Sequence, residues 1–280
     1  MPPIDVFAVC VIVLLGALFV FFQVWARRNG IYAREIREYI PLAAWLRAGI
    51  FFCLFYLISW ATGTLGALLT TPLATPAQLA DRYWWLSVAG LTVFILFAYW
   101  GVWARYTIRF RRKIDPAPQV LFGLLWGTAL GQMLASIWRI VTRMGPTWKL
   151  WQQWLLALVI IGIIQWLLMD MYWDVYISPE HDSPRSIRIK TLCTHIPNVT
   201  LGLIFLALYG NTAIFIALQT LALVGCSLHM RMPAPWSREP TPPARRVPSI
   251  FWGLPRCGGY VPDDPQNDPY LKAAHLDWRR

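Results

Sequence analysis

Acidic side chains gather where one long apolar stretch ends, in the segment WLLMDMYWDVYISPEHDSP at positions 166–184. Asp170 and Asp174 are four residues apart, so their carboxylates would share one face of a helix. Ser178-Pro179 then ends that helix, because proline disfavours helical backbone in the residue before it. A carboxylate at the edge of a membrane can give or take a proton, so Asp170 and Asp174 are candidate catalytic residues.

His195 and Asn198 stand at the start of a later apolar run. In the topology derived below, this run begins at the membrane face where Asp170 ends its own run. We expect His195 to orient a ligand or relay a proton, as a third candidate catalytic residue. Arg47, Arg105 and Asn198 are candidate ligand-binding residues at the same face. The alternative is that Asp170 forms a structural ion pair with Arg47 or Arg105 at headgroup depth.

The histidines and cysteines lack the spacings of metal sites. His195 with Glu180, His181 and Asp182 would supply two histidines and two acids, but no H-x-x-x-H, H-E-x-x-H or C-x-x-C pattern is present. Four of the five cysteines fall inside apolar runs, where buried free thiols are typical. The sequence therefore predicts no metal site, and it points to no particular cofactor.

The elements that must position these residues are membrane spans. Of the 280 residues, 57% are hydrophobic and only 14% are charged, which excludes one ordinary soluble domain. The apolar residues come in runs of about 20, long enough to cross a bilayer. We expect a polytopic integral membrane protein, an all-α helical bundle, with these runs as its spans: 6–26, 42–69, 83–104, 119–140, 151–170 and 192–230.

The last of these runs is too long for one span. As a single helix the segment from Leu192 to Met230 would measure about 58 Å, far more than the roughly 30 Å of hydrocarbon. Gly210-Asn211 in its middle favours a tight hairpin of two spans, which makes about seven in all. Seven spans place 21 lysine and arginine residues on one side and four on the other, whereas six would divide them 13 to 12. The positive-inside rule thus selects seven spans, the N-terminus outside and the C-terminus cytoplasmic.

Two patterns predict how the spans meet one another and the lipid. Gly123, Gly127 and Gly131 are spaced by four, so one helix face lacks side chains and a neighbouring backbone can approach closely. We favour a partner helix in the same chain over one in another subunit. Gln132, Gln165 and Gln219 lie inside spans, where we expect hydrogen bonds between helices. Aromatic groups such as Tyr83-Trp84-Trp85 and Tyr99-Trp100 are typical of span ends at the membrane surface.

The chain divides into two parts by composition. Residues 1–232 form the seven-span transmembrane domain, and residues 233–280 form a basic cytoplasmic tail rich in proline that we expect to be largely extended or disordered. Basic runs beside spans usually determine topology, so we expect no nucleic acid partner. The location would be the cytoplasmic membrane of a bacterium or an organelle membrane of a eukaryote.

Two functions from different classes fit this sequence. The first is a non-catalytic subunit that contacts membrane lipids and packs against other membrane-protein subunits through Gly123, Gly127 and Gly131. The alternative is a membrane-embedded enzyme or binding protein for a lipid or isoprenoid at the cytoplasmic leaflet, with Asp170 or Asp174 as acid or base.

Overall fold

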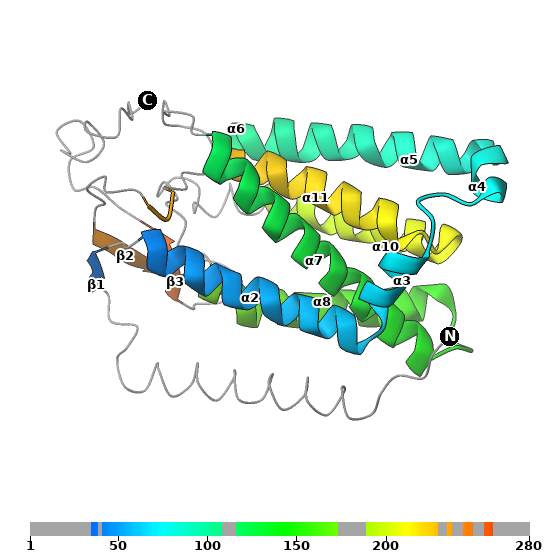
Figure 1. Cartoon of the computed structure of the whole chain (residues 1–280), viewed down its shortest axis with the longest axis horizontal. Coiled ribbons are helices and arrows are strands. Elements are labelled where there is room, and N and C mark those ends of the chain that lie inside the picture. The colour runs from blue at the N-terminus through cyan, green and yellow to red at the C-terminus, as the bar shows by residue number, and fades with distance from the viewer. Residues whose placement is uncertain are drawn as a thin grey trace.

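The fold is a bundle of helices whose direction alternates along the chain (Figure 1). The computed structural model describes residues 35–38, 41–107, 116–172, 189–228, 234–236, 243–248 and 255–259. Its helices, in chain order, are α2 (Pro41–Ala61), α3 (Thr64–Thr70), α4 (Pro76–Ala80), α5 (Arg82–Ile95), η1 (Leu96–Val102), α6 (Trp103–Thr107), α7 (Pro116–Met144), α8 (Leu150–Tyr172), η3 (Thr191–His195), α10 (Ile196–Tyr209) and α11 (Thr212–Leu228). The expected helical bundle is confirmed, since these helices make up most of the described chain.

Three short strands lie beside the start of α2 (Figure 1). They are β1 (Glu35–Glu38), β2 (Pro243–Pro248) and β3 (Pro255–Gly259), and they pair antiparallel in that order. Glu35 is opposite Arg245, and Val247 is opposite Arg256. The sheet brings part of the tail next to the segment before α2, a pairing that the sequence analysis did not expect.

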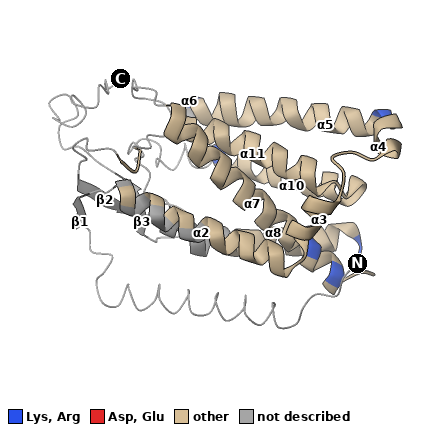
Figure 2. Cartoon of the chain, viewed as in Figure 1, with Lys and Arg blue, Asp and Glu red and all other residues tan. Residues whose placement is uncertain are grey.

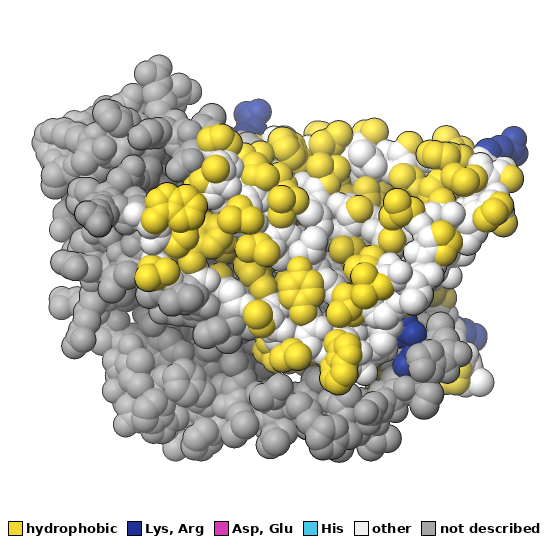
Figure 3. All heavy atoms as spheres, in the orientation of Figure 1, with side chains coloured by type: hydrophobic (Ala, Val, Ile, Leu, Met, Phe, Trp, Pro, Cys, Tyr) yellow, Lys and Arg dark blue, Asp and Glu magenta, His cyan; other side chains and the backbone are white. Residues whose placement is uncertain are grey.

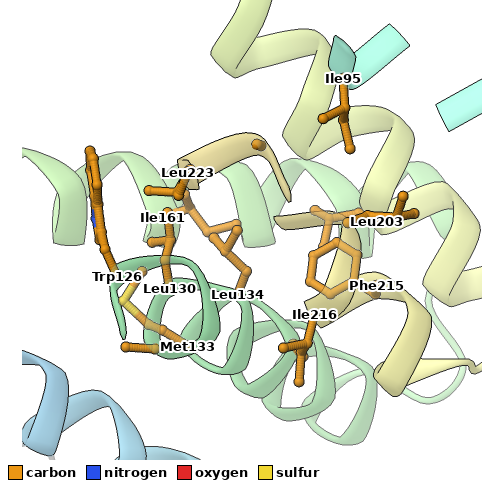
Figure 4. Packing of buried hydrophobic residues seen from close by; sticks show 14 of the residues in the cluster. Ile95, Trp126, Leu130, Met133, Leu134, Ile161, Leu203, Phe215, Ile216 and Leu223 are labelled. Carbon is orange, nitrogen blue, oxygen red and sulfur yellow. The ribbon is translucent and has the colours of Figure 1, made fainter. Parts of the chain in front are cut away.

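α7 is the central helix of the bundle. In the most apolar 18-residue stretch of α7, 72% of the residues are buried. The corresponding share is 22% in the helix 82–105 and 33% in the helix 191–209. Leu130 and Leu134 point from α7 into a core that also receives Ile161, Leu203 and Phe215 from three other helices (Figure 4). The helices around α7 therefore pack on it with one side and expose the other.

The closest of these contacts joins α7 to α11 across the three spaced glycines. A Cβ atom on Gly123 would lie 2.6 Å from the Cα of Val224, and one on Gly131 would lie 3.1 Å from the Cα of Ile216. One on Gly127 would collide with the Cα of Thr220. The predicted close helix contact is confirmed, and its partner belongs to the same chain. Because α11 covers this face, contact with other subunits through the glycines is not needed to explain it.

The hairpin predicted around Gly210-Asn211 is also confirmed. Gly210 adopts a left-handed backbone with φ of 63° and ends α10, a conformation that glycine adopts readily. The Asn211 side chain then accepts a hydrogen bond of 3.0 Å from the amide of Ile214 and starts α11. Nδ2 of the Asn211 side chain donates to the carbonyl oxygen of Leu73 at 2.7 Å, which ties the hairpin to the loop before α4.

The second span is not the continuous helix that the sequence analysis expected over 42–69. α2 and α3 are bent by 80° at a break between them. Gly63 has φ of 73°, and the Thr62 hydroxyl donates to the carbonyl oxygen of Ile58 at 2.9 Å. The backbone thus leaves the helix where a side chain competes for its hydrogen bonds and glycine permits the left-handed turn.

Three of the described helices are long and apolar enough to cross a membrane, and the bent pair α2 and α3 makes a fourth if it counts as one span. Two shorter apolar helical stretches are 150–164 and 212–228. The first expected run, 6–26, lies outside the described residues. Seven spans and the orientation of the termini therefore stay predictions.

The surface matches a membrane location. Lysine and arginine residues of the described chain lie near the ends of the helices (Figure 2), and most side chains on the described part of the face in Figure 3 are apolar. Asp81, at the start of α5, is the one acidic residue among the side chains that the structure describes. The apolar middle and polar ends are what a bilayer requires of a helical bundle.

Candidate functional site

Of the six predicted site residues, two come together, one lies elsewhere, and the side chains of the other three fall outside the described part of the chain. His195 ends η3, and Asn198 is buried in the first turn of α10, beside the same neighbours. Arg105 lies on α6 with an exposed side chain. Asp170 belongs to the last turns of α8, but its side chain, that of Arg47 and the whole of Asp174 lie outside the described part of the chain. The expected pairing of Asp170 with His195 therefore stays a prediction.

Two π-helical segments position this site. η1 interrupts the apolar helix 82–105, where the amide of Trp103 bonds to the carbonyl of Ala98, five residues back. η3 opens the apolar helix 191–209, where the amide of Ile196 bonds to the carbonyl of Thr191, again five residues back. Pro197 follows directly and has no amide hydrogen for a regular helical bond, which favours a widened turn there. Such wide turns are frequent at functional sites, because the extra residue redirects side chains.

A continuous chain of hydrogen bonds links three helical segments at this level: η1, the η3–α10 helix and α11. The Tyr99 hydroxyl lies 3.2 Å from Nδ1 of His195, and Asn198 Nδ2 donates to the same hydroxyl oxygen at 3.2 Å. Asn198 and Gln219 bond to each other twice, at 2.8 Å and 3.4 Å. Because Asn198 donates to the Tyr99 oxygen, the hydroxyl proton can point to Nδ1 of a neutral His195 whose own proton is on Nε2.

Trp103 and Lys190 complete the group, which we call the Tyr99 cluster: Tyr99, Trp103, Lys190, His195, Asn198 and Gln219. The centres of the Trp103 and His195 rings are 5.0 Å apart, with one ring edge-on to the other. Lys190 Nζ lies 4.8 Å from the centre of the Trp103 ring, over its face. The ammonium group over an indole face is a favourable cation–π contact. Nε1 of Trp103 is buried and has no hydrogen-bond partner among the described residues. The cluster thus holds one indole N–H that lacks an acceptor.

This arrangement can hold and protonate a polar group. Tyr99 and His195 form a donor and acceptor pair suited to moving one proton, and Trp103 offers a fixed N–H beside them. Among the described residues no group of three or more His, Cys, Asp or Glu could hold a metal ion. What the geometry provides is buried hydrogen-bond donors within the helical bundle.

Sequence reasoning missed Tyr99, Trp103 and Lys190 as site residues. Tyr99-Trp100 was expected to mark a span end at the membrane surface, and that depth stays a prediction; what the sequence did not indicate is that Tyr99 is only 1% exposed and is enclosed by other helices. The nearest sequence signal was Gln219, because an amide inside a span was expected to bond between helices, and it does. The other expected amides are Gln132, considered below, and Gln165, whose side chain is outside the described residues.

Comparison with known proteins adds no relative. No protein-family model matches the sequence, no curated protein matches it, and no solved structure matches its fold. The Tyr99 cluster is therefore interpreted from its own chemistry.

Proposed function

We propose that this is a membrane-embedded binding protein or enzyme that takes the polar end of a lipid or isoprenoid into the Tyr99 cluster. In the predicted seven-span topology the cluster belongs to the cytoplasmic leaflet. The observation that supports the proposal most is the indole N–H of Trp103, which is buried without a described acceptor. A buried donor with no acceptor is unfavourable by about 1–3 kcal/mol, and a phosphate, hydroxyl or carbonyl oxygen would remove that cost.

The neighbours of Trp103 suit such a ligand. Lys190 contributes a positive charge and is itself only 8% exposed. His195 and Tyr99 lie beside the Trp103 ring and are joined by their own hydrogen bond, which would let them exchange a proton with a ligand bound there. A head group with an acceptor oxygen and an apolar chain would then extend between the spans toward lipid.

Asp170 fits this proposal as an acid or base. It belongs to the end of α8, and Figure 1 shows that α8 and α2 have ends on the side where the strands lie, as do α6 and α11. Asp170→Asn would separate the alternatives raised by the sequence. A structural ion pair predicts loss of folded protein, because a cation is left unpaired. A catalytic acid predicts normal folding and a loss of turnover or bound ligand.

The direct test is native mass spectrometry of the protein purified in mild detergent. We expect a bound lipid in the parent and its loss in Trp103→Phe, which keeps an aromatic ring at this position but removes the N–H together with part of the indole. A fall in occupancy corresponding to about tenfold weaker binding would match one lost hydrogen bond of about 1.4 kcal/mol.

Trp84→Phe is the matched control. Trp84 is 3% exposed, and its Nε1 also lacks a described partner, but it lies at the other end of the third span. Equal loss of lipid from both variants would mean a general effect on the bundle. Unchanged lipid in Trp103→Phe would remove the support for the proposal.

A subunit role is the second candidate, and the face of α5 favours it. α5 belongs to the candidate span with the smallest fraction of buried residues. Its Leu86 and Val93 side chains are 65% and 66% exposed. Val93→Trp remains apolar and suits lipid, yet it would clash with a fitted protein. We expect a stoichiometric partner in native mass spectra, if there is one on this face, to be lost in Val93→Trp. A spectrum with no partner in the parent protein would reject this role.

A further inference from the structure

A second group of polar side chains is buried where α2 breaks. We call it the Thr64 cluster: Ser59, Thr62, Thr64, Gln132 and Ser136, each at most 2% exposed. The Thr64 hydroxyl lies 3.0 Å from that of Thr62 and accepts a hydrogen bond of 3.0 Å from that of Ser136. Three hydroxyl groups from both sides of the break and from α7 thus meet within the apolar bundle.

The α7 members of this group belong to a polar row. Thr128, Gln132 and Ser136 are four residues apart and share one face of the helix. Thr128 bonds to the Tyr56 hydroxyl of α2 at 2.6 Å, and Ser136 bonds to Thr64 beyond the break. Gln132 lies between these two contacts, on the face that α2 and α3 cover. Ser59 is likewise between Tyr56 and Thr64 along the chain.

Two oxygen atoms in this group lack partners. Ser59 Oγ and Gln132 Oε1 are both buried and have no hydrogen-bond partner among the described residues. Ser59 is 0% exposed and Gln132 is 2% exposed, so bulk water does not reach them. Each such atom calls for an explanation, and a bound ion or an enclosed water is the usual one.

We propose that the Thr64 cluster binds a monovalent alkali cation of the size of sodium. Its ligands would be the Ser59 hydroxyl and the Gln132 side-chain carbonyl, with the hydroxyl groups of Thr62, Thr64 and Ser136 around them. Neutral oxygens suit a singly charged hard ion, whereas calcium and magnesium sites rely on carboxylates, and no acidic side chain is described in this group. The C-terminal end of α2 adds partial negative charge, as broken helices do at ion sites in transporters.

Thermal unfolding of the full chain in detergent tests this. The probe is sodium chloride replaced stepwise by choline chloride at constant ionic strength. We expect a saturable rise in Tm with sodium, of about 3–6 °C when sodium reaches ten times its dissociation constant. Binding of radioactive sodium, measured by equilibrium dialysis, should saturate at one ion per chain over the same range.

Two variants keep the test decisive. Ser59→Ala and Gln132→Leu should each fold and lose the sodium-dependent rise, because they remove a ligand that makes no described bond within the protein. Thr92→Val is the control, since its hydroxyl bonds to the carbonyl of Val88 within α5, away from the cluster. It should keep the full rise.

Three outcomes would overturn the proposal. Equal Tm values in sodium and choline would point to an enclosed water only. A sodium effect that persists in Ser59→Ala and in Gln132→Leu would place the ion elsewhere. Failure to detect bound sodium at concentrations that raise Tm would make the effect one of salt on the detergent or the solvent.

Discussion

The two buried polar clusters differ in what they lack. The Tyr99 cluster joins four side chains in one chain of hydrogen bonds, and its Trp103 N–H has no described acceptor. The Thr64 cluster joins hydroxyl groups by hydrogen bonds, and two of its oxygen atoms, on Ser59 and Gln132, have no described hydrogen-bond partner. A buried donor calls for an acceptor and buried oxygens call for a donor or a cation, so the two regions suit ligands of opposite polarity.

The backbone differs between the two regions as well. The Tyr99 cluster is built on π-helical turns, which keep the helix running and only redirect its side chains. The Thr64 cluster is built on a complete break at Thr62 and Gly63, where α2 ends and α3 leaves in a new direction. Figure 1 shows α6 and α3 toward opposite ends of the bundle. One protein thus uses two degrees of helix distortion for two kinds of polar site.

Separating α7 from α11 should disrupt both regions and have the largest effect. Gly127→Leu would force the two backbones apart, and it should cost about 3 kcal/mol or more in the free energy of unfolding. α7 holds Gln132 and Ser136, and α11 holds Gln219, so neither cluster would stay intact. Denaturant unfolding in detergent measures this. Gly90→Leu is the control, because nothing lies within 4 Å of its added Cβ; equal losses in the two variants would refute the contact.

Removing Asn198 should break the Tyr99 cluster alone. Asn198→Leu leaves the buried Gln219 and Tyr99 without a shared partner, so we expect a loss of about 2 kcal/mol in unfolding free energy. In the double variant with Gln219→Leu, the cost should be less than the sum of the single costs, because the two amides bond to each other. Strictly additive costs would contradict the network. The Thr64 cluster should keep its sodium response in both variants.

A smaller pair of effects should appear within the Thr64 cluster. Ser136→Ala removes bonds to Thr64 and to the carbonyl of Gln132, and we expect it to cost about 1 kcal/mol. Ser59→Ala removes a hydroxyl group with no described partner, so without sodium it should cost close to nothing or stabilise slightly. Unfolding in choline chloride compares the two. A larger loss from Ser59→Ala than from Ser136→Ala would show that Ser59 already has a partner.

The last prediction concerns the orientation of the chain, which decides the leaflet in which the Tyr99 cluster lies, and it should leave the stability of both clusters unchanged. In the seven-span topology Cys257 lies in the cytoplasmic tail, so an impermeant thiol reagent added outside intact cells should not label it. After permeabilisation it should be labelled, unless the thiol is buried. A variant without the other four cysteines isolates this signal. Labelling from outside would reverse the orientation and place the Tyr99 cluster at the outer leaflet.

Some features could be predicted because they depend on neighbours along the chain. The apolar runs predicted helices, Gly210-Asn211 predicted the hairpin, and the three glycines predicted a close contact. These are local properties, since a helix face without side chains is fixed by spacing alone. Of the site, His195 and Asn198 were found from the sequence, because polar residues within an apolar run are conspicuous.

Other features required the tertiary structure. The sequence favoured a partner for the glycines in the same chain, but only the packed bundle identifies it as α11. Tyr99 and Trp103 look in sequence like any other aromatic pair at a membrane surface, and their burial depends on which helices surround them. The break at Thr62 was hidden in a run apolar enough for one long helix. Composition and period determine that a segment is a helix in a membrane, whereas the side chains it buries, and the polar atoms left without partners, are decided by its contacts with the other helices.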